Sequence, residues 1–329
     1  MMRNARRATV LVLLAGAIAL PVVEAAQAQQ APPDDAPDRA LAFLRVEVPK
    51  WQQENACFSC HNNGDAARAL MAATQADRLD DKLPLAETLV FLASPDRWDE
   101  NGPDGPFKDK NLARVQFAAA LAEAARDRLV ARDDRVFRQA AAMLTELQAP
   151  DGSWPIGPAG NVGAPATYGQ ALASLMALRA LETLAPEEQH EPIAKARRWF
   201  RATEPKRVLD AAATLWALAG ADDGAAQRQR RRALELIRRG QSPDGGWGPF
   251  VNAPPEVFDT AVVLLALAAQ EDHSHLSPLI RKGRRFLIAQ QFDDGSWPET
   301  TRPRGAESYA QRLSTAGWAT LALLATRGS

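Results

Sequence analysis

Hydrophobic positions along most of this chain recur with helical spacing, and two kinds of helix alternate. The first kind is amphipathic, with basic side chains on its polar side, and the second is apolar almost all round. A loop rich in Pro and Gly separates them. An amphipathic helix faces water, whereas an all-round apolar helix is enclosed, so the pattern predicts two layers. The amphipathic segments are residues 137–147, 233–239 and 286–289, and the apolar segments that follow them are residues 168–184, 257–269 and 313–325.

Three further pairs of segments repeat this rhythm more weakly, which makes six helical hairpins in all. Stacked hairpins of this kind bury a continuous core and can close into a ring. We therefore predict an all-α protein, an α6/α6 toroid with outer and inner rings of helices, over residues 38–329. The weaker pairs are residues 85–92 with 112–124, residues 194–203 with 209–218, and a first pair that begins at 39–44 and continues at about 65–76.

A seven-residue motif, Q-x-x-D-G-[SG]-W, closes each of the three clearest amphipathic segments, with copies at Gln148, Gln241 and Gln291. Asp-Gly supplies a turn that ends a helix, and Trp brings a large apolar body with one N–H that needs a partner. The motif resembles the QW motif of the squalene cyclase and prenyltransferase repeat superfamily, strongly from residue 137 to 325 and only in rhythm before that. The resemblance implies a toroid with a central cavity, in which Gln and Trp tie neighbouring repeats together.

Both cysteines of the chain lie in one pentapeptide, Cys57-Phe58-Ser59-Cys60-His61. In a C-x-x-C-H motif two thiols can add to the vinyl groups of a haem, and the histidine can ligate the iron. These five residues resemble the c-type cytochromes, which implies one covalent haem c. The pentapeptide occupies the place of the Asp-Gly-Trp turn in the first repeat. We therefore expect a haem-attachment loop at residues 57–61, at one mouth of the ring.

The sequence does not identify the second axial ligand of such a haem. His190, His273 and His275 fall in inner-to-outer connections, at the opposite end of helices about 20 Å long, and are expected to be out of reach. Met71 and Met176 are the candidates, although methionine within a helix is also common core filler. An open sixth position would permit ligand binding as well as electron transfer.

Two other chemistries suit the pentapeptide. Cys57 and Cys60 could form a redox-active disulfide, although the βαβ pattern of thioredoxin-like proteins is missing. Zinc is the alternative cofactor, because prenyltransferase toroids bind zinc near the same mouth. Cys57, Cys60 and His61 would then supply three ligands and Asp65 the fourth.

The superfamily resemblance also allows a test for cyclase chemistry. The class II terpene cyclases carry D-x-D-D-T-A, in which the middle acid protonates the substrate. The matching stretch here is E-V-F-D-T-A, residues 256–261, with Phe258 in the place of the proton donor. Phenylalanine cannot donate a proton. Asp259 is the remaining catalytic candidate, and its simpler role is to begin a helix, where carboxylates are favourable.

The first residues predict export. Three arginines precede an apolar run over residues 8–23, and Ala-Gln-Ala at residues 26–28 offers a signal peptidase site. We expect a signal peptide at 1–28, a disordered Pro-rich linker at 29–37, and a periplasmic or secreted mature chain without a transmembrane span. Haem c is attached outside the cytoplasm in bacteria, so this leader agrees with the pentapeptide.

Composition narrows the function. The 329 residues are 46% apolar and 24% charged, with a net charge of −1, which is typical of a globular protein and offers no basic tract for nucleic acid. The main hypothesis is an exported c-type haem protein that transfers electrons to a redox partner protein or binds a haem ligand. The alternatives are a terpene cyclase- or prenyltransferase-like enzyme with an apolar small-molecule ligand in the cavity, or a repeat scaffold for protein interaction.

Overall fold

The computed structural model describes residues 35–76, 78–79, 83–100, 110–156, 164–165, 167–271, 274–300 and 308–328. These residues belong to one compact unit, which begins at Asp35. The predicted signal peptide at 1–28 lies outside the described residues, as do residues 29–34 of the predicted linker.

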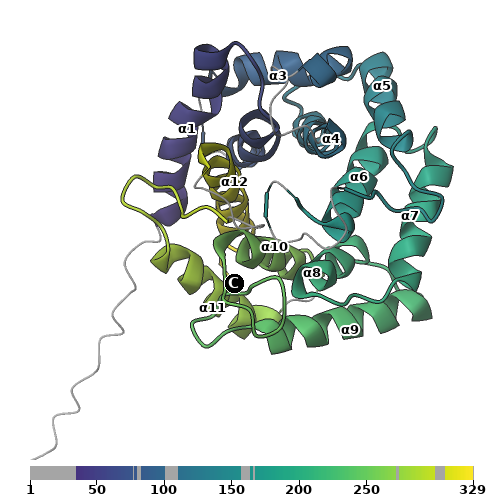
Figure 1. Cartoon of the computed structure of the whole chain (residues 1–329), viewed down its shortest axis with the longest axis vertical. Coiled ribbons are helices and arrows are strands. Elements are labelled where there is room, and N and C mark those ends of the chain that lie inside the picture. Colours follow the sequence, from purple (N-terminus) through teal and green to yellow (C-terminus); the bar gives the residue numbers. More distant parts are fainter. Residues whose placement is uncertain are drawn as a thin grey trace, which may run out of the picture. The chain divides into compact units, whose positions relative to one another are not determined.

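Helices of an outer and an inner ring alternate along this unit, as the sequence predicts (Figure 1). The fold is all-α and is the expected α/α toroid, with the odd-numbered helices outside and the even-numbered helices inside. The outer helices are α1 (Ala36–Asn55), α3 (Ala86–Leu92), α5 (Asp134–Thr145), α7 (His190–Ala202), α9 (Gly224–Gly240) and α11 (Ser277–Ala289). The inner helices are α2 (Ala67–Gln75), α4 (Lys110–Arg126), α6 (Gln170–Leu184), α8 (Val208–Ala217), α10 (Val257–Ala268) and α12 (Tyr309–Ala325). Four short elements accompany them: η1 (Cys60–Ala66), η2 (Leu83–Leu85), η3 (Pro95–Glu100) and η4 (Ser274–Leu276).

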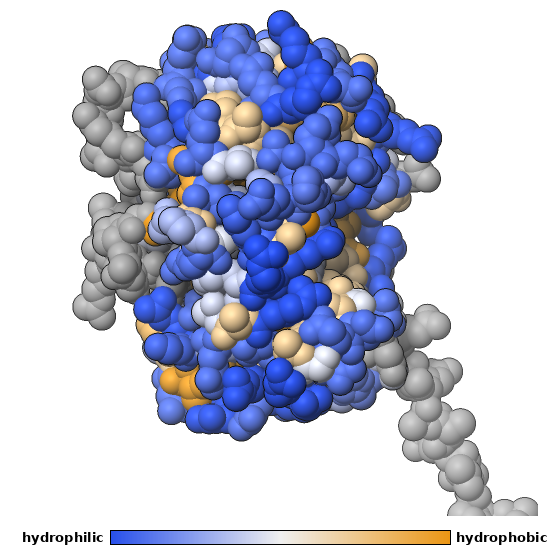
Figure 2. Space-filling model, turned by 90° about the vertical axis from the view of Figure 1, so that its right-hand side faces the viewer, coloured by the Kyte–Doolittle hydropathy of each residue, from blue (hydrophilic) through white to orange (hydrophobic). Residues whose placement is uncertain are grey.

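Burial separates the two rings. All of α10 from Val257 to Leu267 is buried, whereas α9 buries only one stripe of side chains along its length. The remaining faces of the outer helices are polar, and the side of the molecule seen in Figure 2 is mostly hydrophilic. In the described part of the chain, no helix is both long and apolar enough to cross a membrane.

Several helices begin earlier than their hydrophobic pattern predicts. Helix α9 starts at Gly224 and not at residue 233, because Asp223 caps it and accepts hydrogen bonds from two backbone N–H groups. Its first turns are rich in Arg, which favours a helix as well as an apolar residue does. Helix α11 likewise starts at Ser277. The apolar stripe alone therefore underestimates the length of the outer helices.

The predicted linker at 29–37 is wrong at its end. Ala36 and Pro37 are buried and already belong to α1. Proline is tolerated in the first turn of a helix because its missing N–H would have no partner there, and its fixed φ suits the helix. Order therefore begins before Asp38.

The QW motif binds each repeat to the next at three places. Each motif Gln donates from Nε2 to two carbonyl oxygens, one in its own turn and one in the first turn of the following outer helix. All six distances lie between 2.9 and 3.1 Å. The acceptors in the following helices are Pro192, Leu279 and Ala36.

The motif Trp makes a different bond from the one the resemblance implies. Its N–H donates at 2.7 Å to a carbonyl of its own outer helix, in all three copies. Its ring still reaches the next repeat, because a Cβ added at Gly283 of α11 would lie 2.6 Å from the Trp247 ring. The motif Gly has positive φ, +98° at Gly245, and packs closely on the backbone of the next outer helix, which requires glycine.

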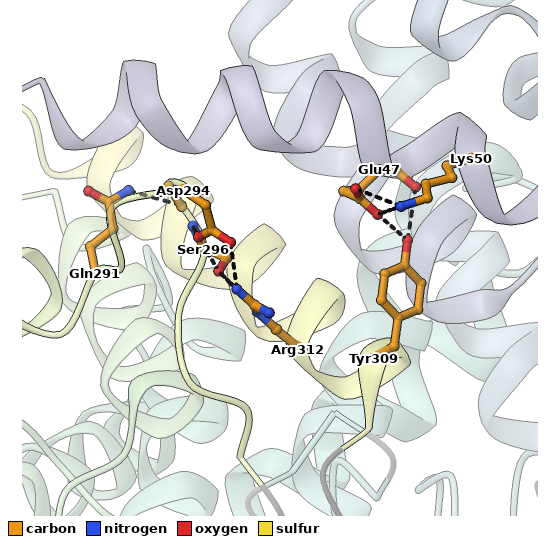
Figure 3. A network of polar contacts seen from close by, with 8 residues as sticks. Glu47, Lys50, Gln291, Asp294, Ser296, Tyr309 and Arg312 are labelled. Carbon is orange, nitrogen blue, oxygen red and sulfur yellow. Dashed lines mark hydrogen bonds and ion pairs between the residues drawn. The ribbon is translucent and has the colours of Figure 1, made fainter.

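The sixth repeat closes the ring on the first (Figure 3). Gln291 donates to the carbonyl of Ala36 at the start of α1, and the Tyr309 hydroxyl donates to Glu47 near its other end at 2.6 Å. Arg312 donates to Asp294 at 2.6 Å and so fixes the last QW turn to α12. The ring is thus joined at its closure by the same Gln contact that joins the two other QW turns to the outer helices after them.

Candidate functional site

The pentapeptide lies where the sequence places it, between α1 and the first inner helix. Helix α1 ends because Ala56 adopts left-handed φ of 49°. Cys57 follows in the turn, and Cys60 and His61 open η1, a π-helix that leads into α2. A π-helical turn is rare and is frequent at functional sites.

Side chains after the pentapeptide hold this loop in place. Ser59 caps η1 by accepting from the His61 backbone N–H at 3.2 Å. Asn62 donates to the carbonyl of Glu47 at 3.1 Å, and Asn63 donates to the hydroxyl of Thr88 at 2.8 Å. The loop is therefore tied to two outer helices, α1 and α3. Sequence reasoning did not single out these asparagines, which stand directly after the motif.

The thiols of Cys57 and Cys60 and the imidazole of His61 are the groups of this loop that could hold a cofactor. Cys57 and Cys60 form no disulfide and are partly exposed, and Trp51 donates from Nε1 to the Cys57 Sγ at 3.2 Å. The Nδ1 atom of His61 is buried and has no hydrogen-bond partner among the described residues. Burial lowers the pKa of His61, against the opposing charge of Asp65. A neutral imidazole and two partly exposed thiols fit the attachment of haem c.

The other predicted iron ligands lie on different elements of the fold. Met71 and Met176 are both buried in the hydrophobic core, on α2 and α6. His190 begins α7 and His275 lies in η4, in inner-to-outer connections as predicted, while His273 lies outside the described residues. Within the ranges that the structure describes, no three His, Cys, Asp or Glu side chains are grouped to hold a metal ion.

Asp65 is not grouped with the cysteines and His61 into a metal site among the described residues, and its carboxylate is held instead by side chains of three other repeats. It is fully buried and accepts hydrogen bonds from Gln116 of α4 at 2.8 Å, from the Tyr168 hydroxyl, and from Ser314 of α12. Burial, together with the neighbouring Asp65, raises the pKa of Tyr168 well above its usual value, so its hydroxyl remains a donor. Four repeats thus meet at one carboxylate, which we call the Asp65 network: Asp65, Gln116, Tyr168 and Ser314.

The Asp65 network could be suspected from the sequence by one signal. Gln116 and Ser314 are polar residues within mostly apolar stretches of predicted inner helices, and Tyr168 is one of only two tyrosines. Buried polar groups are almost always hydrogen-bonded. Their partners, however, lie 51 to 249 positions away in the chain.

Aromatic side chains pack beside this network across the ring. The Tyr168 ring lies 6.1 Å from Phe258 and 5.7 Å from Trp318, and these two are 5.6 Å apart. All three are buried. Phe258, which takes the donor's place in the E-V-F-D-T-A stretch, therefore packs among buried aromatic rings beside the Asp65 network. Asp259 is buried in the first turn of α10, the helix-start position that the sequence predicts for it.

Comparison with known proteins bears on the fold. Residues 203–329 match the squalene-hopene cyclase C-terminal domain. The chain is 39% identical over 104 residues to the terpene cyclase/mutase ntnI of a Nectria species, and 31% identical over 99 residues to lanosterol synthase of Saccharomyces cerevisiae. The chain has a squalene cyclase-type toroid. These matches cover 30% and 29% of the chain but only 14% and 13% of the two relatives, so the chain spans a small part of their length.

Solved structures agree in architecture at low identity. A variant of the type II terpene cyclase MstE from Scytonema, with its substrate geranylgeranyl dihydroxybenzoate, matches with a TM-score of 0.57 and 14% identity, over 89% of this chain and 97% of that one. The unsaturated glucuronyl hydrolase from Bacillus sp. GL1 also matches with a TM-score of 0.57 and 14% identity, over 89% and 96%. Two unrelated activities share this toroid, so these likenesses concern the fold alone.

Proposed function

We propose that this protein carries one covalent haem c at the mouth of its squalene cyclase-type toroid and works as an exported redox or haem-ligand-binding protein. The observation that carries the proposal is the pentapeptide itself: two partly exposed cysteines that form no disulfide, followed at once by an imidazole whose buried Nδ1 has no hydrogen-bond partner among the described residues. Bound haem would supply one-electron or ligand-binding chemistry.

The residues of the chain have distinct parts in this proposal. Cys57 and Cys60 would hold the porphyrin as thioethers, and His61 would ligate the iron from one face. Asn62 and Asn63 tie the loop to α1 and α3 and so orient His61. Met71 and Met176 stay proposals for the second ligand, and zinc at the same thiols stays the alternative cofactor.

Covalent attachment can be tested directly. The full chain, expressed with haem-attachment machinery and exported, is expected to show a Soret band and a covalent haem mass. Both are expected to disappear in Cys57→Ala or Cys60→Ala, because each thioether depends on its thiol. His61→Ala is the matched control: it should keep the covalent mass and change the absorption spectrum.

One result would overturn the proposal. If the wild-type chain carries no covalent haem under conditions in which a control cytochrome c matures, the pentapeptide is not an attachment site. Metal analysis of the same sample then decides on zinc.

The comparisons favour a second function, a cyclase-like enzyme acting on an apolar substrate in the ring. Its support is the match of residues 203–329 to the squalene-hopene cyclase C-terminal domain. Phe258 in the donor's place and the aromatic cluster near the axis weigh against it. Asp259 would have to serve as the acid.

This second function predicts a cyclised product when the protein is incubated with a linear polyisoprenoid, detectable by mass spectrometry. Asp259→Asn would abolish product formation, whereas Asp244→Asn, an exposed acid of a QW turn, would not. Absence of any product from wild-type protein would rule this function out for the substrates tested.

A further inference from the structure

A cavity of about 400 Å³ lies at the end of the ring opposite the pentapeptide. It is lined by the C-terminal half of α6, by α7, by the end of α8 and by Ala269 just after α10. Because each QW turn precedes an inner helix, the C-terminal ends of the inner helices mark the end of the ring opposite the QW turns. We call this space the far-end cavity.

Arg179 of α6 is the central charge of the far-end cavity. Its guanidinium lies over the Trp216 ring, 5.0 Å from the ring centroid. Two acids, Glu123 and Glu182, act electrostatically on Arg179, but they form their ion pairs with Arg126 and Arg197. Among the residues that the structure describes, Arg179 has no ion pair of its own. Burial accordingly lowers its pKa.

The other walls carry arginines that are already paired with acids. Arg197 and Arg201 of α7 line the same space and form ion pairs with Glu182 and Asp223, and Glu182 is the one acidic residue among the described lining residues. The charge of Arg68 on α2 also acts on Arg179, and Arg68 is only 4% exposed. Its Nε and one terminal nitrogen have no hydrogen-bond partner among the described residues. Its Nε is 4.0 Å from Glu123, beyond hydrogen-bond distance. Arg179 is partly buried, and the buried Arg68 lies over the Trp318 ring, 4.8 Å from its centroid. Neither guanidinium is fully compensated by an acid among the described residues, which is costly unless an anion supplies the compensation.

We propose that the far-end cavity binds a small molecule bearing a phosphate group, with Arg179 as its principal ligand. A guanidinium presents paired N–H donors that match phosphate oxygens, and the dianionic charge would offset the excess of arginines. The cavity is larger than phosphate alone, and Trp216, Leu178 and Leu218 would contact the organic remainder. This site is independent of the haem.

Calorimetric titration of the full chain tests the proposal, with inorganic phosphate and octyl phosphate as probes at matched ionic strength. We expect binding of phosphate that weakens about tenfold in Arg179→Gln, because a charge-assisted hydrogen bond is lost. Glu182→Gln should instead strengthen it, because it removes the acid from the wall. Tighter binding of octyl phosphate than of phosphate would identify an amphipathic ligand, and equal binding a free phosphate compound.

The matched control is Arg198→Gln, an exposed arginine on α7 outside the cavity, which should leave phosphate binding unchanged. A purely structural Arg179, which only stacks on Trp216 and balances Glu123, predicts no phosphate binding by wild type. Either that result or equal losses in Arg179→Gln and Arg198→Gln would overturn the proposal. Because Glu182→Gln keeps Arg179 and its stacking, its tighter binding remains a readout even if Arg179→Gln unfolds.

Discussion

Replacing Trp247 with Ala is expected to lower the free energy of unfolding by about 3–5 kcal/mol. Trp247 is fully buried, and its ring fills the space between its own outer helix and Gly283 of the next. Alanine would leave a cavity there and would also orphan the Ile237 carbonyl, which now accepts the indole N–H at 2.7 Å. Since folded domains have a net stability of about 5–15 kcal/mol, this is a large share of the total.

Denaturant unfolding followed by circular dichroism measures this loss. Trp247→Phe keeps most of the apolar volume and loses the N–H, so its expected cost is only about 1–2 kcal/mol. Trp199→Ala on α7 is the control, because Trp199 is partly exposed and belongs to no QW motif. If Trp247→Ala costs no more than Trp199→Ala, the motif Trp does not join the repeats.

The QW motif is also where sequence and structure agree best. Gln, Gly and Trp each perform a task that depends on the residue type: a two-carbonyl donor, a left-handed turn against a backbone, and a buried body with one N–H. Three copies at fixed spacing therefore predict the repeat contacts locally. The starts of α9 and α11 were less predictable, since arginines extend a helix without adding to its apolar stripe.

The ring centre could not be predicted in the same way. Asp65 was interpreted only as a zinc ligand because the cysteines and His61 lie nearby in sequence. Its actual partners come from three other repeats, and only ring closure brings them together. Tyr168 also lies outside its predicted helix, because it has φ of 53° and α6 begins at Gln170. Periodicity predicts which helices face the axis, but not which side chains meet there.

Replacing Asp65 with Ala is expected to cost about 3–5 kcal/mol, as for other removals of one member of a buried charged network. The Asp65 side chain is fully buried and accepts hydrogen bonds from three donors, and alanine would remove the acceptor that they share. Asp65→Asn keeps one acceptor oxygen and should cost about 1–3 kcal/mol. Tyr168→Phe, which removes one hydroxyl, should cost about 1–2 kcal/mol.

The structural consequence of losing Asp65 should be local to the pentapeptide. Asp65 lies in η1 with Cys60 and His61, and its three bonds fix η1 to the ring centre. Hydrogen exchange is therefore expected to rise over residues 60–67 in Asp65→Ala, before exchange in the QW turns changes. If Asp65→Ala is within 1 kcal/mol of wild type, or if exchange rises uniformly round the ring, the Asp65 network does not anchor the loop. If both changes occur as expected, the loop that carries the pentapeptide owes its position to all four repeats that meet at Asp65, which would explain why a short motif stands on so large a ring.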